Sequence, residues 1–181
     1  MNNRKNLVTS KFRAEEKHWR SPSVELVKIN FNGAVFVNEN KSGIGVVIRN
    51  EGGLVLASCA KKIPVIYSGC EIETMAAAAA LSFASDIGIK QAILEGDSLA
   101  VIKALTEDAG SLSPFGLLLD DVKSLANSFE ELSYSNTRRE DNQVAHGLVK
   151  HAKSIPNFIV WIEDVPLQLL LVVQADLISV H

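Results

Sequence analysis

The chain has 181 residues, of which 47% are hydrophobic, and it carries a formal net charge of −3 with a pI near 5.8. This length predicts one domain with tails, and the apolar fraction excludes a disordered chain. The acidic balance argues against a protein that grips nucleic acid by bulk positive charge, although it leaves room for a local basic patch or for metal ions.

Cysteine usage and hydropathy favour an intracellular protein. Cys59 and Cys70 occur in a chain with no visible secretion signal, which predicts reduced thiols in the cytoplasm or nucleus. The longest apolar runs, residues 75–81 and 169–173, are too short to span a bilayer. We therefore expect no membrane partner.

The first half of the chain predicts an antiparallel meander. Residues 1–22 are polar and are interpreted as a flexible leader. Residues 25–37 alternate apolar and polar side chains, which is the period of a strand with one apolar face. Further strands are expected at about 44–48 and 54–61, with turn residues between them.

The second half predicts alternating helices and strands. We expect helices at 71–85, from about 97 to 106, at 115–128 and at 143–152, and strands at 91–95 and 131–138. A strand, a helix and a strand joined by short links predict a parallel crossover. Residues 23–155 form the predicted domain, and residues 156–181 form a tail with a short strand and a last helix.

Four polar residues stand where these elements are expected to meet. Asn32 lies in the first strand next to Gly33, Glu73 in the first turn of the first helix, Asp97 at the end of the fourth strand, and His146 in the last domain helix. A polar side chain in the middle of a sheet costs stability unless something uses it. Asn32 therefore marks a candidate site.

Four segments in this order resemble the ribonuclease H family, and specifically its retrotransposon-derived plant branch. They are KINFNGA at 28–34, Glu73 before the Ala-rich helix, LEGDS at 94–98 and RREDNQVAH at 138–146. Trp19 and residues 161–166 also look like that branch, so the resemblance covers about residues 19–176. It implies a ribonuclease H-like α/β fold, with a five-stranded mixed sheet and helices on both faces.

The resemblance also implies a function, namely metal-dependent hydrolysis of the RNA strand of an RNA–DNA hybrid. Glu73 and Asp97 would be the ligands of Mg²⁺ or Mn²⁺, since hard oxygen ligands suit these ions and two such ions can activate water and stabilise the leaving oxygen. Converging carboxylates repel each other until the metal arrives. Weaker nucleic-acid contacts are expected at Arg138, Arg139 and Asn142.

The sequence departs from the family at two of the four site positions. Asn32 stands where the family has Asp, and His146 stands where the metal-binding members have Asp, although His is frequent there in the plant branch. The site charge falls from about −4 to about −2 if only Glu73 and Asp97 ionise. Each divalent ion then loses on the order of several kcal/mol of attraction. The expectation is a copy that cleaves weakly or not at all.

Each candidate residue also has a simpler structural interpretation. Asp97 is a possible helix N-cap, Glu73 a solvated first-turn residue for which Glu71 competes, and Asn32 a hydrogen-bonded sheet residue. The remaining alternatives are an exposed helix position for His146, an N-cap role for Asn142 and a solvated pair for Arg138 and Arg139. Three functions stay open: a hybrid nuclease, a degenerate relative that binds nucleic acid, and a protein-interaction domain.

Overall fold

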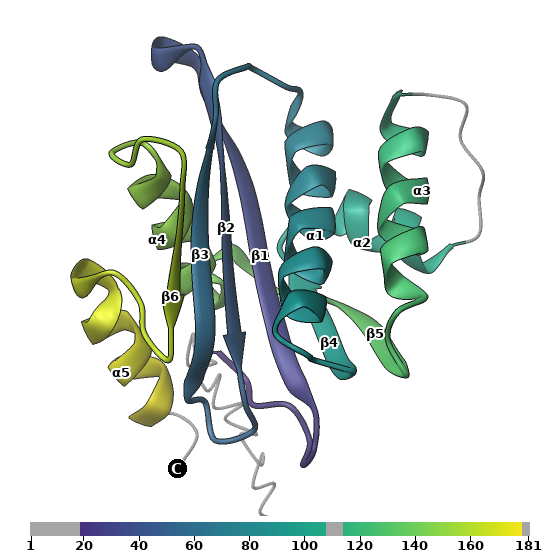
Figure 1. Cartoon of the computed structure of the whole chain (residues 1–181), viewed down its shortest axis with the longest axis vertical. Coiled ribbons are helices and arrows are strands. Elements are labelled where there is room, and N and C mark those ends of the chain that lie inside the picture. The colour runs from purple at the N-terminus through teal and green to yellow at the C-terminus, as the bar shows by residue number, and fades with distance from the viewer. Residues whose placement is uncertain (1–18, 108–113, 179–181) are drawn as a thin grey trace, which may run out of the picture.

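The computed structural model describes residues 19–107 and 114–178, in which helices cover both faces of a mixed sheet (Figure 1). The sheet has six strands in the order β5-β4-β1-β2-β3-β6. The strands are β1 (Val27–Phe36), β2 (Lys41–Arg49), β3 (Val55–Ile63), β4 (Gln91–Gly96), β5 (Glu131–Asn136) and β6 (Phe158–Ile162). The helices are α1 (Gly69–Asp86), α2 (Leu99–Thr106), α3 (Pro114–Ala126), α4 (Gln143–Ala152) and α5 (Leu170–Ile178), with 3₁₀ turns η1 (Val37–Glu39), η2 (Arg139–Asp141) and η3 (Leu167–Leu169).

The predicted order of elements is confirmed, but the predicted number of strands is wrong. We expected five strands, and the sheet has six because β6, the short strand expected in the tail, pairs antiparallel with β3. The division of the chain into leader, domain and tail stays a prediction. Residues 1–18 of the expected leader lie outside the described residues.

The strand register places the candidate residues at one level of the sheet. β1 pairs antiparallel with β2, with Asn32 opposite Gly45. β4 runs parallel to β1, and β5 runs parallel to β4, as the predicted crossover requires. Because Asp97 directly follows β4, the parallel pairing carries it to the level where β1 presents Asn32.

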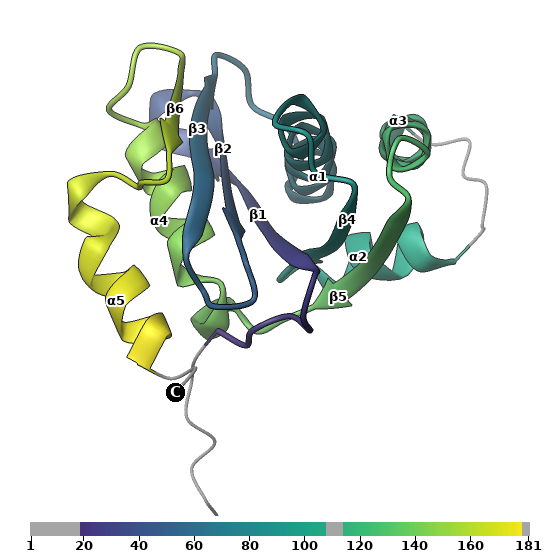
Figure 2. The ribbon, with the colours of Figure 1, turned by 60° about the horizontal axis from the view of Figure 1, so that its bottom comes forward.

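Two glycines allow helices to approach the sheet closely on opposite faces. α1, α2 and α3 cover one face, and α4 and α5 lie on the other (Figure 2). A Cβ added at Gly33 would lie 2.5 Å from the carbonyl oxygen of Ile72 in α1, and one added at Gly45 would lie 2.5 Å from that of Ala145 in α4. These close approaches bring both helices against β1 and β2 beside Asn32.

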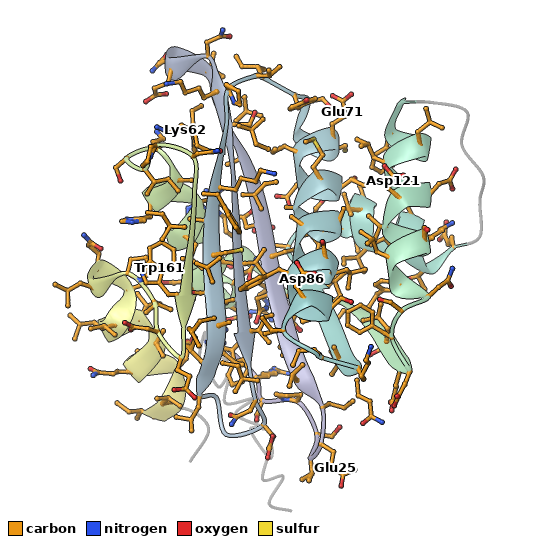
Figure 3. All side chains as sticks on the ribbon, viewed as in Figure 1. Glu25, Lys62, Glu71, Asp86, Asp121 and Trp161 are labelled. Atoms are coloured by element: carbon orange, nitrogen blue, oxygen red, sulfur yellow. The ribbon has the colours of Figure 1, made fainter. Side chains whose placement is uncertain are left out.

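A capping box fixes the start of α1. The Ser68 hydroxyl accepts from the Glu71 N–H at 3.3 Å, and the Glu71 carboxylate accepts from the Ser68 N–H at 2.8 Å. Figure 3 shows Glu71 at the outer end of the helix. α1 is 18 residues long, and none of the described helices is both long and apolar enough to cross a membrane.

The polar face of β1 is buried rather than open to solvent. Lys28 is 5% exposed and Asn30 is fully buried. Trp19 covers them, and its Nε1 donates to the Asn30 Oδ1 at 3.0 Å. Glu95 of β4 accepts from the Asn30 Nδ2 and from the Lys28 Nζ, both at 3.0 Å. The buried polar groups thus satisfy one another, as burial requires.

Arg49 of β2 joins this polar group to the last helix. Its guanidinium lies 4.0 Å from the centroid of the Trp19 ring, and its Nη2 donates to the Asn30 Oδ1 at 3.2 Å. Its Nη1 donates to Asp176 of α5 at 2.7 Å. A buried charge of this kind is tolerated only with such partners.

Candidate functional site

The structure brings Glu73 and Asp97 together in one cleft between α1 and the end of β4. Glu73, Asp97 and Arg139 line this cleft together with the backbone of Gly33, the residue after Asn32. The Glu73 carboxylate accepts a hydrogen bond from the Gly33 N–H, which ties it to β1. The first helix therefore presents Glu73 to the cleft, whereas Glu71 serves the capping box.

The surroundings of Glu73 favour the protonated form of its carboxyl group. Burial, and then the neighbouring charge of Asp97, raise the pKa of Glu73 to about 8, against the lowering effects of the Gly33 N–H and Arg139. Its Oε2 is buried and has no hydrogen-bond partner among the described residues. A buried carboxylate oxygen left unpaired is costly, so this atom is a place where a cation or a donor would stabilise the protein.

Asp97 is half-buried and shares Arg139 with Glu73 as a neighbouring cation, with His146 as an additional neighbour. Burial raises its pKa, while its own backbone N–H, Arg139 and His146 act in the opposite direction. Ser98, the N-cap residue of α2, makes no side-chain capping bond. Asp97 therefore lines the cleft at the end of β4, and Arg139 is the neighbouring charge that lowers its pKa most.

Asn32, His146 and Arg139 form a connected polar chain beside these acids. The Nδ2 of Asn32 lies 3.0 Å from the Nδ1 of His146, and the Nη2 of Arg139 lies 3.2 Å from its Nε2. A neutral imidazole has one N–H and one lone pair, so it cannot accept from both neighbours. Arg139 always donates.

The consistent assignment turns the Asn32 amide so that the His146 Nδ1–H donates to the Asn32 Oδ1, while the Nε2 accepts from Arg139. Burial, then Arg139 and Lys150, lower the pKa of His146, which favours this neutral ring. His146 is thus engaged with the sheet rather than exposed on its helix. Asn32 has a protein partner, as its simpler structural interpretation expects.

Asn142 is buried at the start of α4. It occupies the N-cap position of α4, but its side chain makes no capping bond. Its Nδ2 instead donates to the Phe31 carbonyl of β1 at 2.9 Å, and the residue is 1% exposed. This bond holds the start of α4 against β1, and a contact of Asn142 with nucleic acid stays a prediction. Arg138 and Arg139 are both exposed.

The cleft residues do not fit a two-ion centre. The orphaned Glu73 Oε2 and the Asp97 carboxylate are the hard oxygen donors that Mg²⁺ and Mn²⁺ prefer. Across residues 19–107 and 114–178, however, no three Asp, Glu, His or Cys side chains gather as a possible metal site. Positions 32 and 146, where the family resemblance implies acids, hold an amide and a neutral imidazole that bond to each other.

Sequence reasoning missed the role of Arg139. We expected either a solvated pair with Arg138 or a phosphate contact, and both stay predictions; the exposed side chain also reaches His146 and lowers the pKa of both acids in the cleft. The spacing of the two residues could have indicated this contact, since Arg139 lies just before α4 and His146 lies in its first turn. The 3₁₀ turn η2, which brings Arg139 to His146, could not be predicted from that spacing.

Comparisons with known proteins point to one family. A family model described as reverse transcriptase-like matches residues 30–152. A search of curated proteins gives no match. RNase H1 from the halophilic archaeon Halobacterium salinarum has 27% sequence identity and a TM-score of 0.66, covering 71% of this chain and 97% of its own.

Two further solved structures share the fold. The N-terminal RNase H domain of rv2228c from Mycobacterium tuberculosis, determined as a fusion with maltose binding protein, has 25% identity and a TM-score of 0.65, covering 73% of this chain and 95% of its own. LC11-RNase H1 in complex with an RNA/DNA hybrid has 22% identity and a TM-score of 0.60, covering 70% and 95%. The matched family region ends at residue 152, so β6 and α5 lie beyond it.

Proposed function

The chain belongs to the reverse transcriptase-like family of RNase H-like proteins, and we propose that its cleft binds RNA–DNA hybrid while cleaving it poorly. Glu73 and Asp97 are the acids proposed to act there, with Asn32 and His146 as degenerate positions. The family generally depends on divalent metals, and Mg²⁺ or Mn²⁺ is the proposed cofactor; because the cleft does not fit two ions, we expect it to bind them weakly. Two unpaired cysteines suit the proposed cytoplasmic or nuclear setting.

The unpaired Glu73 Oε2 is the observation that supports this proposal most directly. A structural glutamate at the start of a helix would point to solvent or cap the helix, as Glu71 does. Glu73 instead faces Asp97, at a cost that its raised pKa records. Strongly shifted pKa values of this kind are common at functional sites, where a bound ligand stabilises the charged form. A cleft that holds two acids next to an exposed Arg139 suits a cation together with a phosphodiester.

The proposed loss of cleavage follows from the neutral side chain at position 32. An Asp there would add a negative charge beside the cleft, whereas the Asn32 amide is neutral and bonds to His146. The loss of that charge weakens the attraction for a divalent ion by on the order of several kcal/mol. Substrate phosphates can still meet Arg139, so binding is expected to survive better than cleavage.

A second candidate function is nucleic-acid binding without any cleavage. The closed polar chain of Asn32, His146 and Arg139 favours it, because both groups that replace acids already have protein partners. In that case the protein holds a hybrid or a structured RNA through backbone contacts and salt-dependent phosphate clamps. The two candidates differ only in whether phosphodiester bonds break.

The test is cleavage of an end-labelled RNA–DNA hybrid by the wild type and by Asn32→Asp, each with Mg²⁺ and with Mn²⁺. The new carboxylate can still accept from the His146 Nδ1–H, so the scaffold should tolerate it. We expect slow cleavage by the wild type and at least a tenfold faster rate for the variant, an acceleration equivalent to about 1.4 kcal/mol of barrier.

Two controls make the result specific. Asn127→Asp adds the same charge at an exposed turn after α3 and should leave the rate unchanged. The double variant Asn32→Asp, Glu73→Gln should lose the gain, which separates it from a contaminating nuclease. Salt-dependent binding with no cleavage by any variant would select the second candidate, and no binding at low salt would refute both.

A further inference from the structure

β6 is an edge strand, and all of its exposed side chains are apolar. Phe158, Val160 and Ile162 are 50%, 38% and 64% exposed. The alternate residues, Ile159 and Trp161, pack on the α4 side, and Figure 3 shows Trp161 between β6 and the helices of that layer. No other described strand pairs with the outer edge of β6. An exposed apolar edge strand is a template for pairing with another chain.

The free backbone groups of this edge belong to the same three residues. The Asn157 carbonyl accepts from the Lys62 N–H at 2.7 Å, and the Glu163 N–H donates to the Leu56 carbonyl at 2.9 Å, so both face β3. Backbone groups alternate in direction along an antiparallel ladder. The N–H and carbonyl groups of residues 158, 160 and 162 therefore point outward, away from β3.

This edge is complementary to itself under two-fold symmetry. Antiparallel pairing of two copies centred on Val160 sets Val160 opposite Val160, and Phe158 opposite Ile162 of the second copy. Every outward N–H then meets an outward carbonyl, and the exposed side chains of both copies meet on one face of the joined sheet. A two-fold interface needs a patch that matches itself in this way.

The charges at the two ends of β6 are opposite. Lys61 and Lys62 of β3 lie beside its start, where Lys61 is paired with Phe158, and Figure 3 shows Lys62 at that end. Glu163 and Asp164 follow its last residue, and both are exposed. Antiparallel pairing places the acidic end of one copy next to the basic end of the other, whereas parallel pairing would stack like charges.

We propose that the protein forms a homodimer in which β6 pairs antiparallel with β6 of a second copy, centred on Val160. The resulting interface is a continuous sheet that runs through both copies. It leaves both clefts accessible, because β3 and β2 separate β6 from β1 and the residues beside it. The interface is small, so the dimer dissociates at low concentration.

The test is sedimentation equilibrium of the full chain over a range from about 1 µM to 1 mM. We expect the wild type to pass from monomer to dimer within this range. Val160→Lys and Val160→Glu each place like charges opposite each other at the two-fold axis, and each should weaken dimerisation by roughly tenfold or more. Val160 is partly exposed on an edge strand, so both variants should fold, which circular dichroism can check.

An equimolar mixture of the two variants gives the decisive readout. Opposite charges then meet at the axis, so the mixture should dimerise far better than either variant alone. Leu117→Lys, at an exposed position on α3 that is 68% exposed, is the matched control and should dimerise like the wild type. A wild type that stays monomeric at every concentration would leave the edge to a strand from another protein and overturn the proposal. So would dimerisation unaffected by both Val160 variants, or a mixture that does not recover.

Discussion

Gly33→Ala is the substitution that most directly tests how α1 is seated beside the candidate site. A Cβ at position 33 would lie 2.5 Å from the carbonyl oxygen and 2.7 Å from the carbonyl carbon of Ile72, and 3.0 Å from the Glu73 nitrogen. The closest of these approaches is about 1 Å inside ordinary contact distance. All three atoms belong to the helix backbone, so no flexible side chain can move aside.

The helix must therefore shift or tilt as a unit away from β1. Overpacking of this kind costs about 1–3 kcal/mol, and a rigid neighbour places the expected cost near the upper end. Replacing glycine also restricts the unfolded chain, which returns about 0.4–1 kcal/mol. We expect a net loss of about 2 kcal/mol in the free energy of unfolding. The shift also moves Glu73 away from Asp97, so binding of hybrid should weaken.

Urea unfolding followed by circular dichroism measures this loss. Gly69→Ala is the control in the same helix, because a Cβ there meets nothing within 4 Å. That variant should be as stable as the wild type or slightly more stable, by up to about 1 kcal/mol. If Gly33→Ala proved as stable as Gly69→Ala, the close seating of α1 on β1 would be wrong, and with it the account of how Glu73 reaches the cleft.

Three further substitutions test the buried polar groups. Glu73→Gln should stabilise the metal-free protein as pH rises. The folded pKa of about 8 exceeds the ordinary value of 4.5, so the wild type loses stability between these two pH values. The gain, on the order of 5 kcal/mol well above pH 8 and near zero at pH 4.5, is measured by urea unfolding in EDTA; a pH-independent gain would contradict the pKa argument. Trp19→Ala should cost about 3–5 kcal/mol, because it opens a cavity and removes the cover of Asn30, and a thermal melt unchanged from the wild type would show that Trp19 does not dock. Asn142→Ala should cost about 1–3 kcal/mol, because it leaves the Phe31 carbonyl without its donor, whereas Asn127→Ala at an exposed turn should cost less than about 0.5 kcal/mol in the same melt.

Local patterns in the sequence predicted most of the fold. The period of two at residues 25–37 and the Ala-rich run after Glu73 each describe an element by its own residues, so the strand β1 and the helix α1 could be predicted. β6 was expected as a strand but not as a member of the sheet, because its partner β3 lies about a hundred residues earlier. Pairing between strands so far apart in the sequence produces no pattern in the residues of either strand.

The site was predicted less completely than the fold, for a related reason. The motifs located Glu73, Asp97, Asn32 and His146, and the structure places the two acids in one cleft. The bond between Asn32 and His146, and the reach of Arg139 to that histidine, depend on how a turn folds in three dimensions. Their roles in catalysis or binding stay predictions.

The guanidinium of Arg49 contacts residues near both ends of the described chain, and both of these residues lie outside the region that the family model matches. Trp19 stacks on it from one end of the described chain, and Asp176 neutralises it from the other. The family match runs only from residue 30 to 152. A protein trimmed to that match would lose both Trp19 and Asp176, and the buried guanidinium would keep its hydrogen bond to Asn30 but lose its salt-bridge partner. We therefore expect residues 19–176 to be needed for full stability, and shortening this segment at either end should destabilise the fold without removing the residues that line the cleft.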